Sequence, residues 1–555
     1  MAASESTSDG GAPAASPTPR APVEAAPTSA GLARSAGVVG AATMTSRVLG
    51  LARDQVLAYW FGAGDAMDAF LVAFRVPNLV RDLFAEGAMS AALVPTFSKT
   101  LAADGRDRAW RLGNSVMNAL ALVTGALVIA AIVFAPQLVG WMAGDFADVP
   151  GKFELTVTLT RIMAPFLVLV AVAAACMGML NSLDVFFVPA LAPAMFNVAS
   201  IAVGLGLVPV AISAGVEPIL AMGIGTLLGG LGQVLLQWPA LKARGYRYLP
   251  RLDLADPGLH RILVLMGPGI VGLAATQLNV FVNTVVATSQ GTGAVSWLNY
   301  AFRVMYLPIG LFGVSIATAA TPTVSRQAAA GDMATMRSTL ASAVSLMLML
   351  NVPATVGLVV LSGPIVRLLL ERGSFAAADT AATAAAVQLY AIGLVGYSIV
   401  KILSPAFYAL GRSRTPAAVG VVSVLLNAVL SVSLAPVFGY RGIALSASIA
   451  ALVNAASLIW LMRAALGGLE LGRVLATAVR IAIAAAAMGA VAWWGERWLT
   501  VVLPGPETGR QIVRLGAAIV MALAVLAASA SALRIREFEE VAAGVVRRLG
   551  RLSRR

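Results

Sequence analysis

The chain has 555 residues, of which 59% are hydrophobic and only 12% are charged, and its mean hydropathy is +0.86. This composition excludes an ordinary water-soluble protein, because most of the chain is too apolar to fold around a core with a polar surface. The net charge of +13 raises the question of nucleic-acid binding, but in a membrane protein the distribution of basic residues matters more than their sum.

The first 34 residues are rich in Ala, Pro, Ser and Thr and nearly free of large apolar side chains. We therefore expect this segment to be disordered. It lacks the apolar core and small-residue cleavage site of a signal peptide, so the first hydrophobic segment is expected to remain in the membrane.

From about residue 36 to residue 533, apolar runs recur that are each long enough to cross a hydrocarbon core of ~30 Å. The runs are rich in Leu, Ala, Val and Gly and do not alternate, which favours helices. We therefore predict an all-α polytopic membrane protein with about fourteen transmembrane helices. The predicted helices cover 36–62, 67–100, 113–142, 153–180, 187–209, 217–241, 261–288, 295–325, 338–361, 380–408, 415–435, 441–463, 474–495 and 511–533.

Basic residues are unevenly divided between the two sides of this topology. If the N-terminus is cytoplasmic, cytoplasmic segments hold about 24 Lys or Arg and the opposite side about 6, a strong positive-inside bias. Both termini are then cytoplasmic. The bias accounts for the net charge through topology and attraction to anionic lipid, so we expect membrane lipids as partners and no nucleic acid.

The chain also contains an internal repeat with a period of about 227 residues. AFRVP at 73–77 matches AFRVM at 301–305, and VPTFSK at 94–99 matches TPTVSR at 321–326. Each unit holds six predicted helices, and an even number preserves orientation, so the halves are parallel repeats of the kind found in alternating-access transporters. The predicted parts are a disordered N-terminus (1–34), an N-lobe (35–242), a C-lobe (243–465), two extra helices (466–533) and a basic cytoplasmic tail (534–555).

Charged side chains are concentrated in the first two predicted helices. Each ionised residue at mid-bilayer costs ~2.5–3.5 kcal/mol on insertion scales, so such a group is tolerated only where its members face a wet cavity or one another. Asp68, Arg75 and Asp82 recur at a spacing that places them on one helix face. The whole band comprises Arg47, Arg53, Asp54, Asp68, Arg75, Arg81, Asp82 and Glu86.

Two interpretations of this band are open. Opposite charges could simply pair, for example Arg53 with Asp68, and lock the two helices together. Alternatively, the arginines of the band, joined by Arg303 from the second half, outnumber the nearby acids and line a cavity for an anion. Guanidinium groups bind phosphate through two parallel hydrogen bonds, so a pyrophosphate is the candidate that we favour.

Other candidate residues carry weaker signals. Lys401 is an isolated cation in the tenth predicted helix and either lines the cavity or extends toward the interface. We assign Asp54, Asp82, Glu86 and Lys401 as gating residues or charge partners. The single cysteine and single histidine exclude a disulfide framework and a paired-histidine zinc site, and we predict no metal site and no catalytic residues.

Several long segments resemble the MurJ (MviN) family of lipid II flippases, which act in peptidoglycan synthesis. These are SRVLGLARD at 46–54, RVPNLVRDLFAEGAMSAALVPTFSK at 75–99, SWLNYAFRVMYLPIGLFGVSIATAATPTVS at 296–325 and KILSPAFYALGRSRTP at 401–416. The likeness runs from about residue 36 to 533. It implies a fold of the multidrug/oligosaccharidyl-lipid/polysaccharide exporter superfamily, with two six-helix lobes in a V and two extra helices.

The resemblance also implies site residues and a function. Cavity arginines would bind the pyrophosphate and sugars of the substrate, and the last two helices with the second lobe would hold its polyprenyl tail. By motif position, substrate binding falls to Arg47, Arg53, Asp68, Arg75, Arg81 and Arg303, and Glu86 is a candidate for the conformational gate. The implied function is to flip lipid II from the cytoplasmic to the outer leaflet of the bacterial inner membrane for cell-wall synthesis and cell shape, with cell-wall synthesis or division proteins as further partners.

The chain differs from the pattern of the family in two places. Phe302 stands before Arg303 where some relatives have an acid. Some relatives bind sodium through carboxylates of the second lobe, whereas this chain offers amides there, namely Asn279, Asn283, Asn427 and Asn454. We expect no cofactor, with a coupling cation left open and the membrane potential, worth ~2.3 kcal/mol per charge per 100 mV, as the direct energy source.

Other functions remain as alternatives. The nearest is a flippase for another polyprenyl-pyrophosphate-linked glycan or a drug antiporter of the same superfamily, although a cationic cavity disfavours cationic drugs. An enzyme of lipid-linked sugars would need carboxylates or a metal-binding loop outside the membrane, and the external loops are short. A scaffold for division proteins would not need a buried charged band.

Overall fold

The structure is a computed structural model that describes residues 29–83, 89–250 and 252–540. Within those residues it contains helices and no strand. Long apolar helices satisfy every backbone donor and acceptor internally, which is what a lipid environment requires. Glu86, the predicted gate residue, and most of the predicted N-terminal and C-terminal segments lie outside the described residues.

The first group of helices, here called the first bundle, runs from α1 to α8. Its members pack closely, with α7 against α1 and α8, and α6 against α3 and α8. Its helices are α1 (Ser29–Phe61), α2 (Asp65–Leu83), α3 (Met89–Val133), α4 (Ala135–Ala143), the short η2 (Gly144–Asp148), α5 (Lys152–Met163), α6 (Phe166–Asn181), α7 (Phe187–Ser213) and α8 (Ile219–Ala243).

The second bundle runs from α10 to α16. Here α13 packs against α10 and α12, and α16 against α14 and α15. Its helices are α10 (Ala294–Pro308), the π-helical turn η3 (Ile309–Gly313), α11 (Val314–Ala329), α12 (Met333–Leu370), α13 (Ala377–Ile392), α14 (Leu394–Ala409), α15 (Arg414–Phe438) and α16 (Tyr440–Leu466).

Helix α9 (Pro257–Thr288) connects the two bundles, since it packs against α3 of the first and α15 of the second. The linker before it is fastened to α3. The Asn114 Oδ1 atom accepts from the Tyr246 hydroxyl at 2.7 Å, and the Asp256 carboxylate, which caps α9, meets Arg108 at 3.0 Å. Burial raises the pKa of the Tyr246 phenol above its ordinary value.

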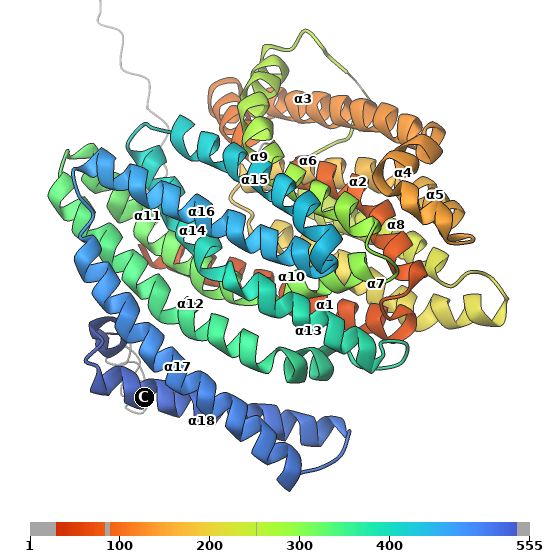
Figure 1. Cartoon of the computed structure of the whole chain (residues 1–555). Helices are drawn as coiled ribbons and strands as arrows, with labels where there is room; N and C mark the ends of the chain where they lie inside the picture. The colour runs from red at the N-terminus through yellow and green to blue at the C-terminus, as the bar shows by residue number, and fades with distance from the viewer. Residues whose placement is uncertain (1–28, 84–88, 251, 541–555) are drawn as a thin grey trace, which may run out of the picture.

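Two further helices, α17 (Leu471–Val502) and α18 (Thr508–Ala532), form a hairpin outside both bundles. Figure 1 shows this hairpin, in blue, lying along α12 at one edge of the molecule. The outward faces of both helices carry large exposed apolar side chains such as Leu475, Val501 and Val520, as expected for helices that face lipid.

Ten helices of the described residues are long and apolar enough to cross a membrane, or eleven if the bent pair α13 and α14 is one span. The predicted count of fourteen is therefore not confirmed. The charged band explains part of the difference, because α2 alone contains Asp65, Asp68, Arg75, Arg81 and Asp82 in its 19 residues. The all-helical, multi-pass membrane architecture is confirmed.

The predicted helix boundaries differ from the structure mainly near the N-terminus. Helix α1 begins at Ser29, inside the segment expected to be disordered. The predicted helix over 67–100 corresponds to α2 together with the start of α3, and α3 itself is interrupted at Gly105, whose φ of 79° departs from helical geometry. Glycine adopts this left-handed conformation at no steric cost.

Candidate functional site

A cavity of about 470 Å³ lies between the two bundles. Its walls come from α2, α9, α10 and from α13 to α16, so every wall except α2 and α9 belongs to the second bundle. Charged residues on these walls are Arg75, Asp82, Arg303 and Lys401, and most of the remaining polar lining consists of amide and tyrosine side chains. A polar space of this kind inside an apolar helical protein is a candidate binding site.

Two smaller hollows adjoin the charged band. One of about 350 Å³ lies between α1, α10 and α12 and is lined by Arg47, Asp54 and Arg303. The other, about 310 Å³, lies inside the first bundle and is lined by Arg53 and Arg81. The predicted substrate-binding arginines therefore line three hollows rather than a single space.

The carboxylate of Asp54 on α1 connects the two bundles by holding two arginines. Its Oδ1 accepts from Arg53 Nη2 at 2.9 Å, and its Oδ2 accepts from Arg303 Nη1 of α10 at 2.6 Å. The Asp54 side chain is 9% exposed and that of Arg303 39%. Two guanidiniums around one carboxylate leave one net positive charge, and Arg303 is the member that reaches the central cavity.

A second carboxylate, Asp82, holds an arginine in the same way. Its Oδ1 accepts from Arg81 Nη2 at 2.7 Å, and its Oδ2 accepts from Asn78 at 3.3 Å and from Gln277 of α9 at 3.0 Å. Two of the arginines thus pair with the acid that follows them in the sequence, Arg53 with Asp54 and Arg81 with Asp82.

Arg75 and Lys401 differ from these arginines. Neither has an ion pair or a side-chain hydrogen bond within the described part of the chain, and the Arg75 Nε atom is buried without a partner. They line the same cavity from opposite bundles, Arg75 on α2 and Lys401 on α14. The cavity therefore presents two cations that the protein itself does not neutralise.

Asp68 lies away from this cavity, fully enclosed where α2 meets α10. Its carboxylate accepts from the backbone N–H of Gly293 at 2.7 Å and from the N–H and hydroxyl of Ser296 at 3.0 and 2.7 Å. Helix α10 has no side-chain cap of its own. An acid of the first bundle thus caps a helix of the second, where the free N–H groups and the helix dipole favour a negative charge.

Lys152, at the start of α5, fixes this acid. Its ammonium is 2% exposed and lies 3.1 Å from Asp68 Oδ2 and 2.8 Å from Asp65 Oδ1. It also lies 4.1 Å from the ring centroid of Phe146. Asp65 in turn accepts from the Thr292 hydroxyl at 2.7 Å. One buried cation therefore joins two acids that contact the start of α10.

The backbones of the two bundles touch beside this contact. Ser374, between α12 and α13, donates from its N–H to the Tyr59 carbonyl at 2.8 Å and from its hydroxyl to the Trp60 carbonyl at 3.1 Å. Gly62 and Gly373 both have left-handed φ angles, and a Cβ on either would overlap a backbone carbonyl of the other segment. Only glycine permits so close an approach.

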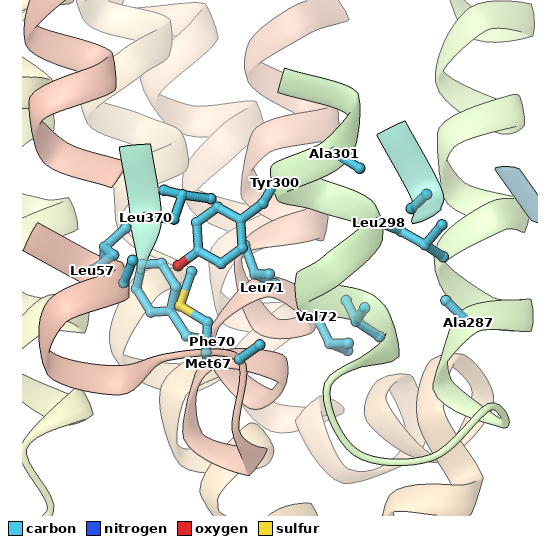
Figure 2. Close-up of a cluster of buried hydrophobic side chains, with 14 of the residues drawn as sticks. Leu57, Met67, Phe70, Leu71, Val72, Ala287, Leu298, Tyr300, Ala301 and Leu370 are labelled. Carbon is cyan, nitrogen blue, oxygen red and sulfur yellow. The ribbon is translucent and has the colours of Figure 1, made fainter. Parts of the chain in front are cut away.

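Apolar side chains fill the seam between these polar contacts and the cavity. Figure 2 shows Met67 and Phe70 of α2 beside Tyr300 of α10 and Leu370 of α12, with the Tyr300 hydroxyl turned toward them. We call this end of the molecule the closed end; it comprises the contacts of Asp68, Lys152 and Ser374 and this apolar seam.

The role of the predicted substrate-binding residues stays a prediction, but the structure places each of them. Arg47, Arg75 and Arg303 line hollows at the bundle interface, and Arg53 and Arg81 line the hollow inside the first bundle. Asp68 is placed elsewhere in this state, at the closed end, and the suggested pair of Arg53 with Asp68 is not formed, because Asp54 holds Arg53 and Lys152 holds Asp68.

Lys152 is the residue that sequence reasoning missed. The signal was available, because basic residues are scarce on its predicted side of the membrane. A lysine on that side is a stronger indication of a specific structural role than a lysine in a basic cytoplasmic loop.

Three of the predicted amides form a network between α9 and α15. Asn427 Nδ2 donates to Asn279 Oδ1 at 3.0 Å and to Asn283 Oδ1 at 2.7 Å, and the Ser431 hydroxyl donates to Asn283 Oδ1 at 3.2 Å. These groups are neutral hydrogen-bonding partners, although the Asn427 Oδ1 atom is buried without a partner of its own. Phe302, at the position where some relatives were expected to have an acid, packs with the rings of Tyr306, Tyr390 and Tyr397.

Comparisons with known proteins agree on a family. Residues 57–504 match the sequence profile described as Lipid II flippase MurJ. A probable lipid II flippase MurJ of Rhizobium meliloti (strain 1021) is 37% identical over 477 residues, covering 84% of this chain and 87% of the relative. A lipid II flippase MurJ of Burkholderia cenocepacia is 34% identical over 416 residues, covering 74% and 80%.

Solved structures show the same fold. A lipid II flippase MurJ in an inward closed conformation matches with a TM-score of 0.73 at 25% identity and covers 89% of this chain and 99% of that one. A multidrug resistance MATE family transporter of the MOP superfamily, in an inward-facing conformation, matches with a TM-score of 0.64 at 16% identity, covering 78% and 99%. The second likeness concerns the fold alone.

Proposed function

The chain belongs to the lipid II flippase MurJ family, and from this premise we propose that it moves lipid II, a polyprenyl-pyrophosphate-linked peptidoglycan precursor, across the membrane. The pyrophosphate of lipid II, beside the first sugar, is negatively charged. The observation that best supports the proposal is the cavity between the bundles, in which Arg75 and Arg303 present positive charge inside an otherwise apolar protein. Transport of this kind makes and breaks no covalent bond.

The closed end is proposed to face outward. It lies opposite the clusters of basic residues, including Lys99, Arg106 and Arg108 around the break in α3 at Gly105, and such clusters favour the cytoplasmic side. The state described here would then be inward-facing. Both termini would be cytoplasmic, and the membrane would be the bacterial inner membrane.

Binding would act through the ion pairs at the interface. Arg303 is held by Asp54 but is 39% exposed, so a pyrophosphate entering the cavity can bind its guanidinium through two charge-assisted hydrogen bonds. The pyrophosphate would thereby compete with Asp54, which keeps Arg53 as its partner. Binding would weaken the ion pair of Asp54 with Arg303 that joins α1 to α10.

Outward release would then require the closed end to open. The hydrogen bonds that Asp65 and Asp68 accept from Thr292, Gly293 and Ser296 join the bundles directly, so alternating access means exchanging them for water. Hydrogen bonds to water replace these contacts when the end opens, which keeps the cost of opening within reach of substrate binding. The membrane potential acting on the cavity cations is our proposal for the driving force.

Complementation tests the function. In a bacterium depleted of its own lipid II flippase, expression of this chain should restore growth and the appearance of lipid II on the outer leaflet, detected by a probe that cannot cross the membrane. A chain that inserts normally but restores neither would refute the proposal. Restoration of another polyprenyl-linked glycan alone would assign the substrate to that class instead.

A further inference from the structure

Lys401 is the charged group of the cavity that the translocation of a pyrophosphate leaves unused. It stands on α14, in the second bundle, and its side chain is exposed to the cavity. Within the described residues it has no ion pair or hydrogen bond. Arg303, by contrast, is already held by Asp54.

Two further polar side chains, Asn454 and Ser423, lie on the same cavity wall as Lys401. Close packing of α14 on α16, where a Cβ on Gly396 would meet Ala451, fixes the register of two helices that run in the same direction. Lys401 is five residues beyond Gly396 and Asn454 three beyond Ala451, so at 1.5 Å per residue they lie within roughly 3 Å of the same depth. Ser423 of α15 lines the same cavity.

Asn454 supplies the second feature. Its Oδ1 atom is buried and has no hydrogen-bond partner. A buried acceptor without a partner is costly because it has lost its hydrogen bonds to water, and a donor from a ligand would remove this cost. The wall therefore offers a cation for a carboxylate and an acceptor for an N–H group, a combination that matches a peptide rather than a phosphate.

We propose that Lys401 and Asn454 form a subsite for the peptide stem of the substrate, with the Lys401 ammonium binding a stem carboxylate and Asn454 Oδ1 accepting from a peptide N–H. This inference rests on the proposed function, because lipid II joins the pyrophosphate and a carboxylate-bearing peptide in one molecule. The arginines and Lys401 would then bind different parts of one substrate. The second bundle would select for the stem, and the bundle interface for the pyrophosphate.

The test measures binding of two lipids to the purified full-length protein in nanodiscs. One is lipid II with free stem carboxylates, and the other is the same lipid with those carboxylates converted to carboxamides. The wild-type protein should bind the acid form about tenfold more tightly, as expected for a hydrogen-bonded charge pair in a partly wet site. Lys401→Gln should remove this preference without changing the affinity for the amide form, and Lys401→Arg should retain it.

Controls separate the subsite from its premise. Lys242→Gln, at the end of α8 and outside the cavity, should leave both affinities unchanged. Equal binding of both lipids by the wild-type protein, or an equal loss for both in Lys401→Gln, would overturn the subsite alone. The second result would also point to an anionic lipid phosphate as the group that Lys401 binds. If the wild-type protein binds neither lipid, the proposed function fails, and the subsite fails with it.

Discussion

Asp54 illustrates how single residues control this site. It is the only acid that contacts Arg53 and Arg303 in the described structure, and those two arginines belong to different bundles. Removing one partner from a buried charge cluster is costly because the remaining charges are left desolvated and unpaired. Asp54 thus stabilises both the local fold and the contact between bundles.

Replacing Asp54 with asparagine should therefore destabilise the protein. Two adjacent guanidiniums would lose their counter-charge, and we expect the unfolding free energy to fall by about 1–3 kcal/mol, less than for a fully buried pair because Arg303 is partly solvated. Thermal denaturation in detergent measures the effect. Asp148→Asn, on an exposed turn, is the matched control, and equal melting temperatures for the two variants would contradict this role of Asp54.

At the closed end the charges are reversed, because one cation, Lys152, holds two acids. Its ammonium lies between Asp65 and Asp68, so Lys152→Met would leave two acids facing each other without a cation. We expect the closed end to open more often, with an increase of about fivefold or more in the open population.

A cysteine at position 67 reports this opening. Met67 is 1% exposed in the seam, and the native Cys176 is also buried. In the Met67→Cys background, Lys152→Met should speed labelling by a membrane-impermeant maleimide added from outside, whereas Lys242→Met should not. Unchanged labelling in the Lys152 variant would show that its ammonium does not hold the end closed.

Sequence reasoning located the arginines and the acids Asp54 and Asp82 but not which arginine pairs with which acid. A group of charges in apolar helices is recognisable from composition alone, since its energetic cost is high. Partners depend on rotamers and on helices distant in sequence. Neighbouring residues do not share a helix face, so the pairing of Arg53 with Asp54 was not expected. Long arginine side chains fold back to reach the acid beside them.

At the scale of elements, the closed end depends on helix termini and turns. The start of α10 has no cap within its own bundle and takes one from Asp68 on α2. Next to it, the turn after α1 and the turn after α12 cross so closely that both require glycine. These contacts exist only while the bundles meet at this end, so each stabilises the closed state specifically.

Gly373→Ala tests the backbone crossing. The new Cβ would overlap the Tyr59 carbonyl oxygen and would also occupy a left-handed backbone conformation. Gly331→Ala imposes a similar conformational strain, roughly 1–2 kcal/mol, at a turn where no atom lies within 4 Å of the new Cβ. We expect Gly373→Ala to lower the melting temperature further and to increase labelling of Met67→Cys. Equal behaviour of the two variants would mean that the crossing does not hold the end closed.

Most helices could be predicted because a lipid environment selects long apolar runs, and α7, α8, α15 and α16 lie within a few residues of their predicted ranges. The region of α2 and α3 was predicted less well. There the apolar signal is diluted by charges, and the predicted helix over 67–100 joined two separate elements. The hydropathy pattern is thus weakest where polar residues line the cavity.

For the molecule as a whole, the contacts describe one state of a two-state transporter. One end is sealed by capped, paired and close-packed groups, and the space behind it presents unpaired cations. The internal repeat predicted two similar halves, and the helices do pack in two groups. The exact boundaries of the lobes stay a prediction, since α9 packs against both groups. Conformational preference depends on such tertiary contacts, which no repeat or hydropathy pattern encodes.

The most direct measurement is the amount of lipid II exposed on the outer leaflet of flippase-depleted cells that express either the wild-type chain or Arg303→Ala. Losing the arginine that faces the cavity should reduce exposure at least about tenfold, as expected when one partner of a desolvated charge pair is removed. Arg463→Ala, on the exposed last turn of α16, should flip normally at equal expression. Wild-type levels of exposed lipid II in Arg303→Ala would contradict the account that the arginine cavity carries the substrate.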